Sequence, residues 1–79
     1  MTKKQKKISK KILNYLKKNP KAEDTLEGIT MWWLEFERID QSIDEVSETL
    51  DSMVQSGEIE KLYHNANNMV TFRARHSRD

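Results

Sequence analysis

The chain contains no cysteine, one proline and two glycines in its 79 residues. Without cysteine, neither a disulfide nor a thiolate metal site can stabilise the fold, which fits a reducing compartment such as the cytoplasm. The apolar stretch of residues 28–34 is far too short to cross a bilayer, which needs about 20 such residues. The basic N-terminus lacks the apolar segment of a secretory signal, so we expect no membrane span and a cytoplasmic location.

The length predicts one domain, covering residues 1–79. Hydrophobic residues make up 35% of the chain and charged residues 34%, which is polar but sufficient for a small helical core. We expect the core within about residues 6–75, a basic N-terminal extension at 1–7 and a frayed tail at 76–79.

The net charge of +1 conceals three blocks of opposite sign. Residues 1–21 hold nine lysines and no acid, whereas residues 22–60 hold twelve acids and one arginine, for a net charge of −11. Residues 61–79 carry a net charge of +3. Such blocks influence partners and association rates far more than they influence the fold.

The first third of the chain predicts a helix that begins at Thr2, because Thr2 and Gln5 have capping-box spacing. Proline cannot continue a helix, so Asn19-Pro20 ends it. The apolar residues Ile8, Ile12, Tyr15 and Leu16 share one face of this helix.

A second helix is expected to begin at Asp24, which stands in capping-box spacing with Glu27. Its inward stripe comprises Leu26, Ile29, Trp33 and Phe36. Trp32 and Met31 lie at or beyond the margin of that stripe, and two interpretations are open. Trp32 packs under the first helix or the hairpin, or it forms with Met31 and Leu34 an exposed apolar patch of the kind that marks a protein contact.

A third helix is expected from Ser42, which forms a capping box with Glu45, to Gly57. Its apolar stripe contains Val46, Leu50 and Met53. Residues 58–64 and 69–75 then alternate as two strands around a turn rich in asparagine. We place His64 at the junction between the first of these strands and the turn, and His76 in the tail.

The order of two helices, a capped third helix, Gly57-Glu58-Ile59 and a hairpin resembles the winged-helix family, a helix-turn-helix variant found in many transcription regulators. The resemblance covers roughly residues 6–75 and implies an α+β fold, a three-helix bundle followed by a β-hairpin wing. In that family the third helix enters the major groove of DNA, and the wing contacts a neighbouring groove or phosphates.

The outward positions of the third helix depart from this pattern. They are expected to carry four carboxylates and three hydroxyls and no cation: Asp44, Glu45, Ser47, Glu48, Thr49, Asp51 and Ser52. Carboxylates repel phosphates, and non-specific DNA binding depends on lysine and arginine. The leading hypothesis is therefore a non-enzymatic module that binds another protein through Asp44, Glu45, Glu48 and Asp51, with Trp32 and Met31 as an apolar anchor.

The alternative is a DNA-binding transcriptional regulator that contacts phosphates through its first helix and its C-terminal arginines. Its candidate contacts are Lys3, Lys4, Lys6, Lys7, Lys10, Lys11, Ser47, Thr49, Ser52, Asn67, Arg73 and Arg75. A third hypothesis is self-association, as a weak homodimer in place of a monomer, in which the basic segment of one chain faces the acidic region of another. The same complementarity can also act within one chain.

Residues for catalysis are sparse. With two histidines and no cysteine, the sequence offers no pairing of a nucleophile with a base. Its two glycines are isolated, so it has no phosphate-binding loop, and its acids lack the spacing of a calcium loop. We expect no enzymatic activity, no metal and no cofactor.

Overall fold

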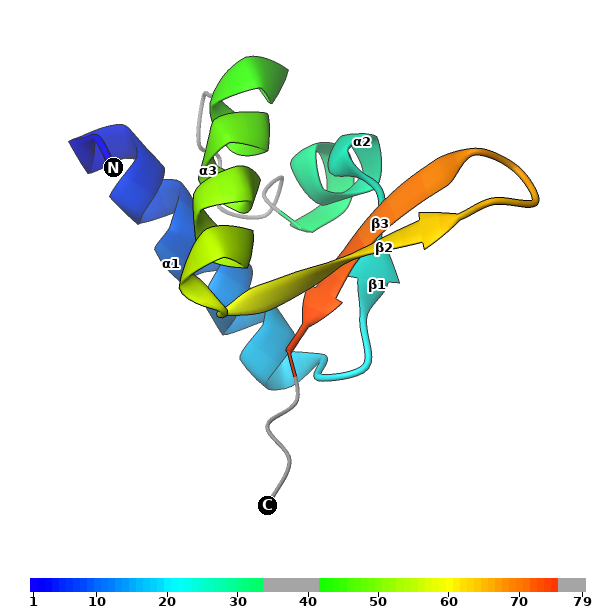
Figure 1. Ribbon diagram of the computed structural model, residues 1–79. Coiled ribbons are helices and arrows are strands. Elements are labelled where there is room, and N and C mark those ends of the chain that lie inside the picture. Colours follow the sequence, from blue (N-terminus) through cyan, green and yellow to red (C-terminus); the bar gives the residue numbers. More distant parts are fainter. Residues whose placement is uncertain (34–41, 76–79) are drawn as a thin grey trace.

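The computed structural model describes residues 1–33 and 42–75. In chain order they form helix α1 (Lys3–Lys18), strand β1 (Glu23–Asp24), helix α2 (Leu26–Gly28) and the π-helical turn η1 (Ile29–Trp33). Helix α3 (Ile43–Ser56) and strands β2 (Ile59–His64) and β3 (Met69–Ala74) follow. Helices and an antiparallel hairpin in this order make a small α+β domain with a winged-helix-like arrangement (Figure 1).

Capping boxes begin both long helices, as the sequence predicts. The Thr2 hydroxyl accepts the Gln5 N–H and the Gln5 side chain accepts the Thr2 N–H, so two of the unpaired donors at the start of α1 are satisfied. Ser42 and Glu45 form the same pair at the start of α3. Gly57 ends α3 in the left-handed conformation, with φ of 83°, and turns the chain into β2.

The second helical segment differs from the expectation. Asp24 lies in β1, and the cap of α2 is Thr25, whose hydroxyl accepts the Gly28 N–H. The segment continues as a π-helical turn, in which each turn holds more residues than in an α-helix. The expected inward residues Ile29 and Trp33 are buried, whereas Phe36 of the same expected stripe lies outside the described residues.

The sheet has three antiparallel strands in the order β1-β3-β2, so β3 is central. Strand β1, which the sequence did not predict, pairs Glu23 with Arg73 and Asp24 with Phe72. The hairpin pairs β2 with β3 over their full length, from Ile59 opposite Ala74 to His64 opposite Met69. The tip of this hairpin projects away from the helices (Figure 1).

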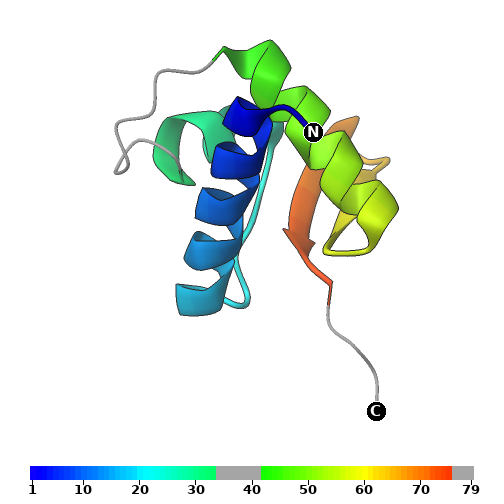
Figure 2. The same ribbon diagram turned by 90° about the vertical axis from the view of Figure 1, so that its left-hand side faces the viewer.

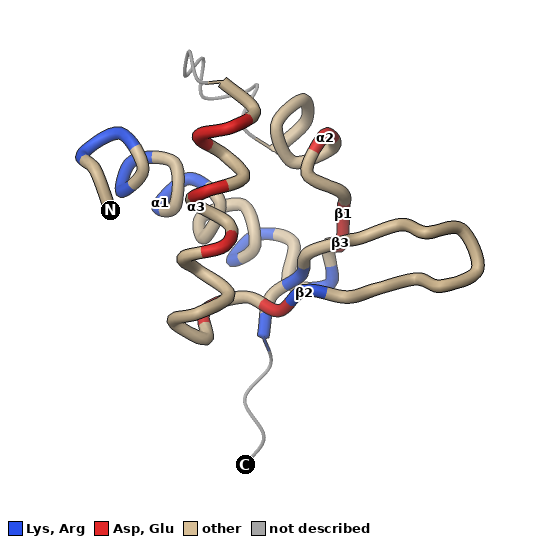
Figure 3. The backbone as a smooth tube through the Cα atoms, turned by 45° about the horizontal axis from the view of Figure 1, so that its top comes forward, with Lys and Arg blue, Asp and Glu red and all other residues tan. Residues whose placement is uncertain are grey.

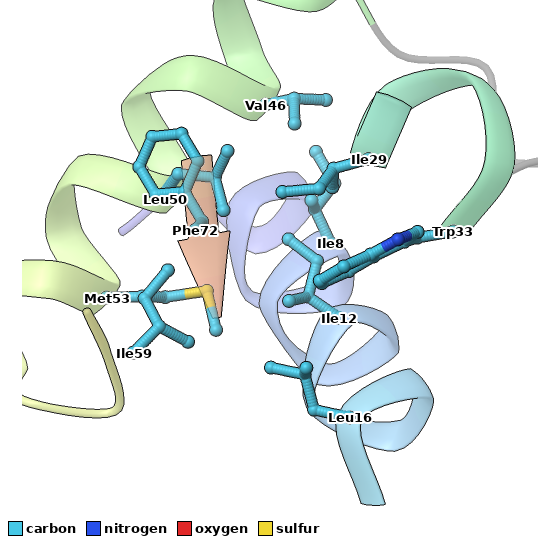
Figure 4. Close-up of a cluster of buried hydrophobic side chains, with 10 residues drawn as sticks. All are labelled: Ile8, Ile12, Leu16, Ile29, Trp33, Val46, Leu50, Met53, Ile59 and Phe72. Carbon is cyan, nitrogen blue, oxygen red and sulfur yellow. The ribbon is translucent and has the colours of Figure 1, made fainter. Parts of the chain in front are cut away.

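One apolar core joins the helices to the sheet. Figure 2 shows α1 on one side of the molecule and the hairpin on the other. Side chains from α1, η1, α3 and both long strands converge there (Figure 4), namely Ile8, Ile12, Leu16, Ile29, Trp33, Val46, Leu50, Met53, Ile59 and Phe72. The ring of Trp33 stacks on that of Tyr15, with centroids 4.6 Å apart. This packing fixes the outward faces of α1 and α3, which carry the charged surfaces.

Candidate functional site

Helix α3 presents a row of carboxylates that we call the acidic face, made of Asp44, Glu45, Glu48 and Asp51. The first three turns of the helix place Asp44, Glu48 and Asp51 in solvent, while Glu45 is half-buried. Figure 3 shows these acids along α3, with further acids on α2 and the strands, and lysines along α1. The expectation of outward-facing acids on this helix is therefore met at Asp44, Glu48 and Asp51, and only in part at Glu45.

Two of these carboxylates are engaged by α1. The Lys4 ammonium group lies 3.2 Å from Glu45, and the Gln5 side chain donates a 2.9 Å hydrogen bond to Glu48. The hydrogen bond from Lys4, aided by the Ser42 N–H, holds the pKa of the Glu45 carboxyl below its ordinary value. These contacts tie the start of α1 to α3, so part of the charge complementarity acts within the chain.

The remaining acids of this face, Asp44 and Asp51, have neither an ion pair nor a hydrogen bond from their carboxylates to the residues that the structure describes. Asp44 lies in the first turn of α3, where a negative charge favours the helix dipole. Asp51 lies two turns further along, where that effect has faded. Asp51 is therefore the acid of this face whose negative charge is explained neither by a partner in the described residues nor by the helix dipole.

The placement of Thr49 on the outward face was wrong. Its side chain is fully buried, and its hydroxyl donates a 2.7 Å hydrogen bond to the Glu45 carbonyl. Position 49 lies at the edge of the apolar stripe and turns toward the core, so Thr49 cannot contact a partner. Ser47 and Ser52 are half-buried at the two sides of the helix.

A groove with a cavity volume of about 560 Å³ lies between α2, α3 and the hairpin. Its charged lining consists of Glu27, Asp51 and Lys61, and Ser47 and Asn67 contribute polar groups. The Lys61 ammonium group sits 5.6 Å from the ring centroid of Tyr63 and 5.9 Å from that of Phe72. The groove is thus net acidic. The sequence interpretation missed Glu27 because it assigned this residue to a helix cap.

The two neighbouring tryptophans have opposite environments. Trp33 is 4% exposed and belongs to the core, whereas Trp32 is 56% exposed and Met31 is 59% exposed. The interpretation in which Trp32 packs beneath the first helix or the hairpin is excluded. Trp32 and Met31 form an exposed apolar pair on η1, as the other interpretation expected, whereas Leu34 of the same expected patch lies outside the described residues.

Six lysines on the outward side of α1 form a second charged surface, which we call the lysine ridge. They are exposed and have no ion pair with any residue that the structure describes: Lys3, Lys6, Lys7, Lys10, Lys17 and Lys18. Lys4 lies to one side of the ridge and binds Glu45, and Lys11 is half-buried. The ridge therefore contains four of the six basic candidates in the first helix.

The C-terminal arginines do not extend this ridge. Arg73 forms an ion pair with Glu60 of the neighbouring strand, which neutralises it locally. Arg75 is exposed and lines a shallow hollow of about 420 Å³ with Tyr63 and Val54. The turn residue Asn67 faces the net acidic groove. The structure therefore separates the nucleic-acid candidates into different surfaces.

A polar cluster joins β1 to the hairpin. His64 is the last residue of β2, as the expected strand over residues 58–64 predicts, and its Nε2 lies 3.0 Å from Glu23 and 2.9 Å from the Thr71 hydroxyl. Thr71 donates a 2.6 Å hydrogen bond to Glu23, and this bond together with the His64 contact holds the pKa of the Glu23 carboxyl below its ordinary value. The cluster anchors the two-residue strand β1.

Within residues 1–33 and 42–75, no three His, Cys, Asp or Glu side chains gather in a way that could hold a metal ion. None of the helices in this part of the chain is long and apolar enough to cross a membrane. Comparison with protein-family models, with curated proteins and with solved structures finds no match to the chain. The case for a function therefore depends on the surfaces themselves.

Proposed function

We propose that this protein is a non-enzymatic winged-helix-like module that binds another protein through the acidic face of α3 and the adjoining groove. The observation that carries the proposal is the charge of this side of the molecule. Asp51 and Glu27 line the groove without ion partners among the described residues, and Asp44 is exposed nearby on α3. Of the three charged residues that line the groove, only Lys61 is a cation.

This charge disfavours a nucleic-acid ligand at the same place. A duplex is held by cations that neutralise its phosphates, and each unpaired carboxylate adds repulsion. A carboxylate can accept a hydrogen bond from cytosine, but such contacts need basic support that α3 does not supply. A protein partner with a basic surface is attracted instead, because its cations interact favourably with these carboxylates.

The exposed pair on η1 supports the same proposal. Trp32 and Met31 each keep more than half of their surface in water. Tryptophan is enriched among the few residues that dominate binding energy at protein interfaces, where it fills a pocket of the partner. An exposed tryptophan beside a methionine thus supplies the apolar anchor that an acidic surface lacks.

The test is a quantitative pull-down with the wild-type chain and three variants, each checked for an unchanged thermal transition. Asp51→Lys reverses a groove charge, Trp32→Ala removes the anchor, and Gln55→Lys adds a charge on an exposed position of α3 outside the groove. We expect a protein that the wild type and Gln55→Lys retain and that Asp51→Lys and Trp32→Ala lose at least tenfold. Equal retention by all four chains would refute the proposal.

The lysine ridge favours one second candidate function, binding of nucleic acid through α1 by a transcriptional regulator. Six exposed lysines on one helix face, with no acid anywhere in α1, make the most basic surface in the described part of the chain. Its test is a titration of the labelled protein with duplex DNA at about 50 and about 200 mM salt, followed by NMR. Affinity for about six phosphates should fall about a thousandfold over that range. Absent or salt-independent shifts at the ridge would exclude this candidate.

A further inference from the structure

The lysine ridge of α1 and the groove beside α3 are complementary in charge. We propose that the groove of one molecule binds the lysine ridge of a second copy of this chain. This inference rests on the proposed function, since it names one protein that the acidic side of the molecule binds.

The ridge supplies a long and uniform row of cations. Lys3 and Lys18 are fifteen residues apart in one helix, which corresponds to about 22 Å along its axis. The only uncharged residue of α1 that is exposed is Asn14, so the ridge has no exposed apolar residue with which to enter a membrane or a hydrophobic pocket. Its ligand must therefore be anionic.

The groove can hold both parts of a lysine side chain. Leu26, Val70 and Phe72 provide apolar lining, on which a four-carbon stem can lie. Glu27 and Asp51 line the same groove, and their exposed carboxylates can accept hydrogen bonds from an ammonium group. Asp44 and Glu48 add negative charge to the same helix.

These two surfaces do not meet within one molecule. The ridge lies on the side of α1 opposite to the buried Ile8, Ile12 and Leu16, while the groove is lined by residues of α2, α3 and the hairpin. In the described part of the chain, no ridge lysine forms an ion pair with Glu27 or Asp51. Both surfaces are therefore open to a neighbour.

The contact uses different surfaces on the two copies, so it is heterologous. Such contacts produce open-ended assemblies of molecules unless the rotation between neighbours closes a ring. Each bound molecule still offers a free ridge at one end and a free groove at the other. Exposed ion pairs are weak and are screened by salt, so the association should depend on concentration and on ionic strength.

The first measurement is sedimentation of the wild-type chain over a range of concentrations. At about 10 mM salt, where the Debye length is about 30 Å, we expect the average mass to rise with concentration above that of the 9.4 kDa monomer. At about 1 M salt the Debye length is about 3 Å, and the monomer should return. A monomer at every concentration in low salt overturns the inference.

The second measurement uses two neutralised chains that each keep one surface. Lys6→Gln with Lys10→Gln weakens the ridge, and Glu27→Gln with Asp51→Asn weakens the groove. Each chain alone should remain monomeric at low salt, while their equimolar mixture should form a one-to-one complex that does not grow. Glu58→Gln, an exposed acid outside the groove, should assemble like the wild type.

Failure to form the mixed complex overturns the inference, because the chains then associate by other surfaces or not at all. Association that persists at about 1 M salt and is lost in Trp32→Ala also overturns it, since an apolar contact is then responsible. Neither result decides the proposed function, which is refuted when the wild type, Asp51→Lys, Trp32→Ala and Gln55→Lys all retain the pull-down partner equally.

Discussion

Gly57 stands between α3 and β2 with φ of 83°, a conformation that costs other residues energy. Its N–H is bonded to the end of α3, and the chain reverses there into the hairpin. We expect Gly57→Ala to lower the free energy of unfolding by about 1–2 kcal/mol. Gly57→Asn should cost less, because asparagine tolerates this region. Urea unfolding checks both, and an alanine variant as stable as the wild type would contradict the argument.

Glu23 gives the fold a dependence on pH. Its pKa is lowered in the folded chain, mainly by the hydrogen bond from Thr71 and also by His64 and Arg73, so the ionised carboxylate stabilises the fold. That stabilisation is complete above the ordinary glutamate value of about 4.3 and disappears as the pH falls through the lowered value. At pH 7 the wild type should therefore have a higher melting temperature than Glu23→Gln. The difference between the two melting temperatures should narrow below about pH 4. A difference in melting temperature that stays constant down to acid pH would exclude stabilisation of the fold by the Glu23 carboxylate.

The individual side chains show which local features a sequence reveals. Thr2 and Ser42 were predicted as caps because a capping box involves only residues three apart. Thr49 was misplaced because its position at the edge of a helical stripe can face either way, and packing against the core decides. The hydrogen bonds of His64 were not predicted because its partners, Glu23 and Thr71, are distant in the sequence or on another strand.

Among the elements, α3 depends on its first turn. The Ser42 hydroxyl accepts the Glu45 N–H, and Glu45 also binds Lys4 of α1, so the cap is linked to the contact between the two helices. Ser42→Ala should cost about 1 kcal/mol, within the usual range for a lost cap, whereas Ser42→Asp should retain most of the stability. Thermal unfolding followed by circular dichroism measures the difference. If Ser42→Ala and Ser42→Asp both melted at the temperature of the wild type, α3 would not depend on this cap.

The elements that the sequence did not predict are short or irregular. Strand β1 has two residues, too few to show an alternating pattern, and it exists because Glu23 and Asp24 pair with the central strand β3. The π-helical geometry of η1 was not predicted either, because the spacing of the buried Ile29 and Trp33 also fits an ordinary α-helix. Gly28 is explained only by the structure, since an added Cβ would fall 1.9 Å from Asp24 Oδ1.

At the scale of the whole molecule, opposite charges are separated onto different surfaces. The sequence showed the blocks of charge, but it could not show which acids are already paired. Lys4 and Gln5 engage half of the acidic face, while the groove brings Glu27 beside Asp51 from another helix. The candidate site was therefore predictable only in part. The negative charge of α3 followed from the sequence, whereas the shape of the groove depends on contacts between α2, α3 and the hairpin.

This separation of charge leads to a prediction in which stability and binding respond differently. Lys7 lies near the N-terminus of α1, where a cation opposes the helix dipole, and it has Lys3 one turn before it. Lys17 lies in the last turn, where a cation is favourable. We expect Lys7→Glu to stabilise the fold by about 0.5–1 kcal/mol and Lys17→Glu to destabilise it by a similar amount.

Both substitutions remove the same charge from the lysine ridge, so both should weaken its binding to an anionic partner several-fold. Urea unfolding of dilute protein gives the stability, and sedimentation at low salt gives the association. If the ridge merely keeps the chain in solution, association will not change in either variant. If its binding is the reason for these lysines, the more stable Lys7→Glu chain will associate as poorly as the less stable Lys17→Glu chain. The early lysines then represent stability given up for binding, as is common at functional surfaces.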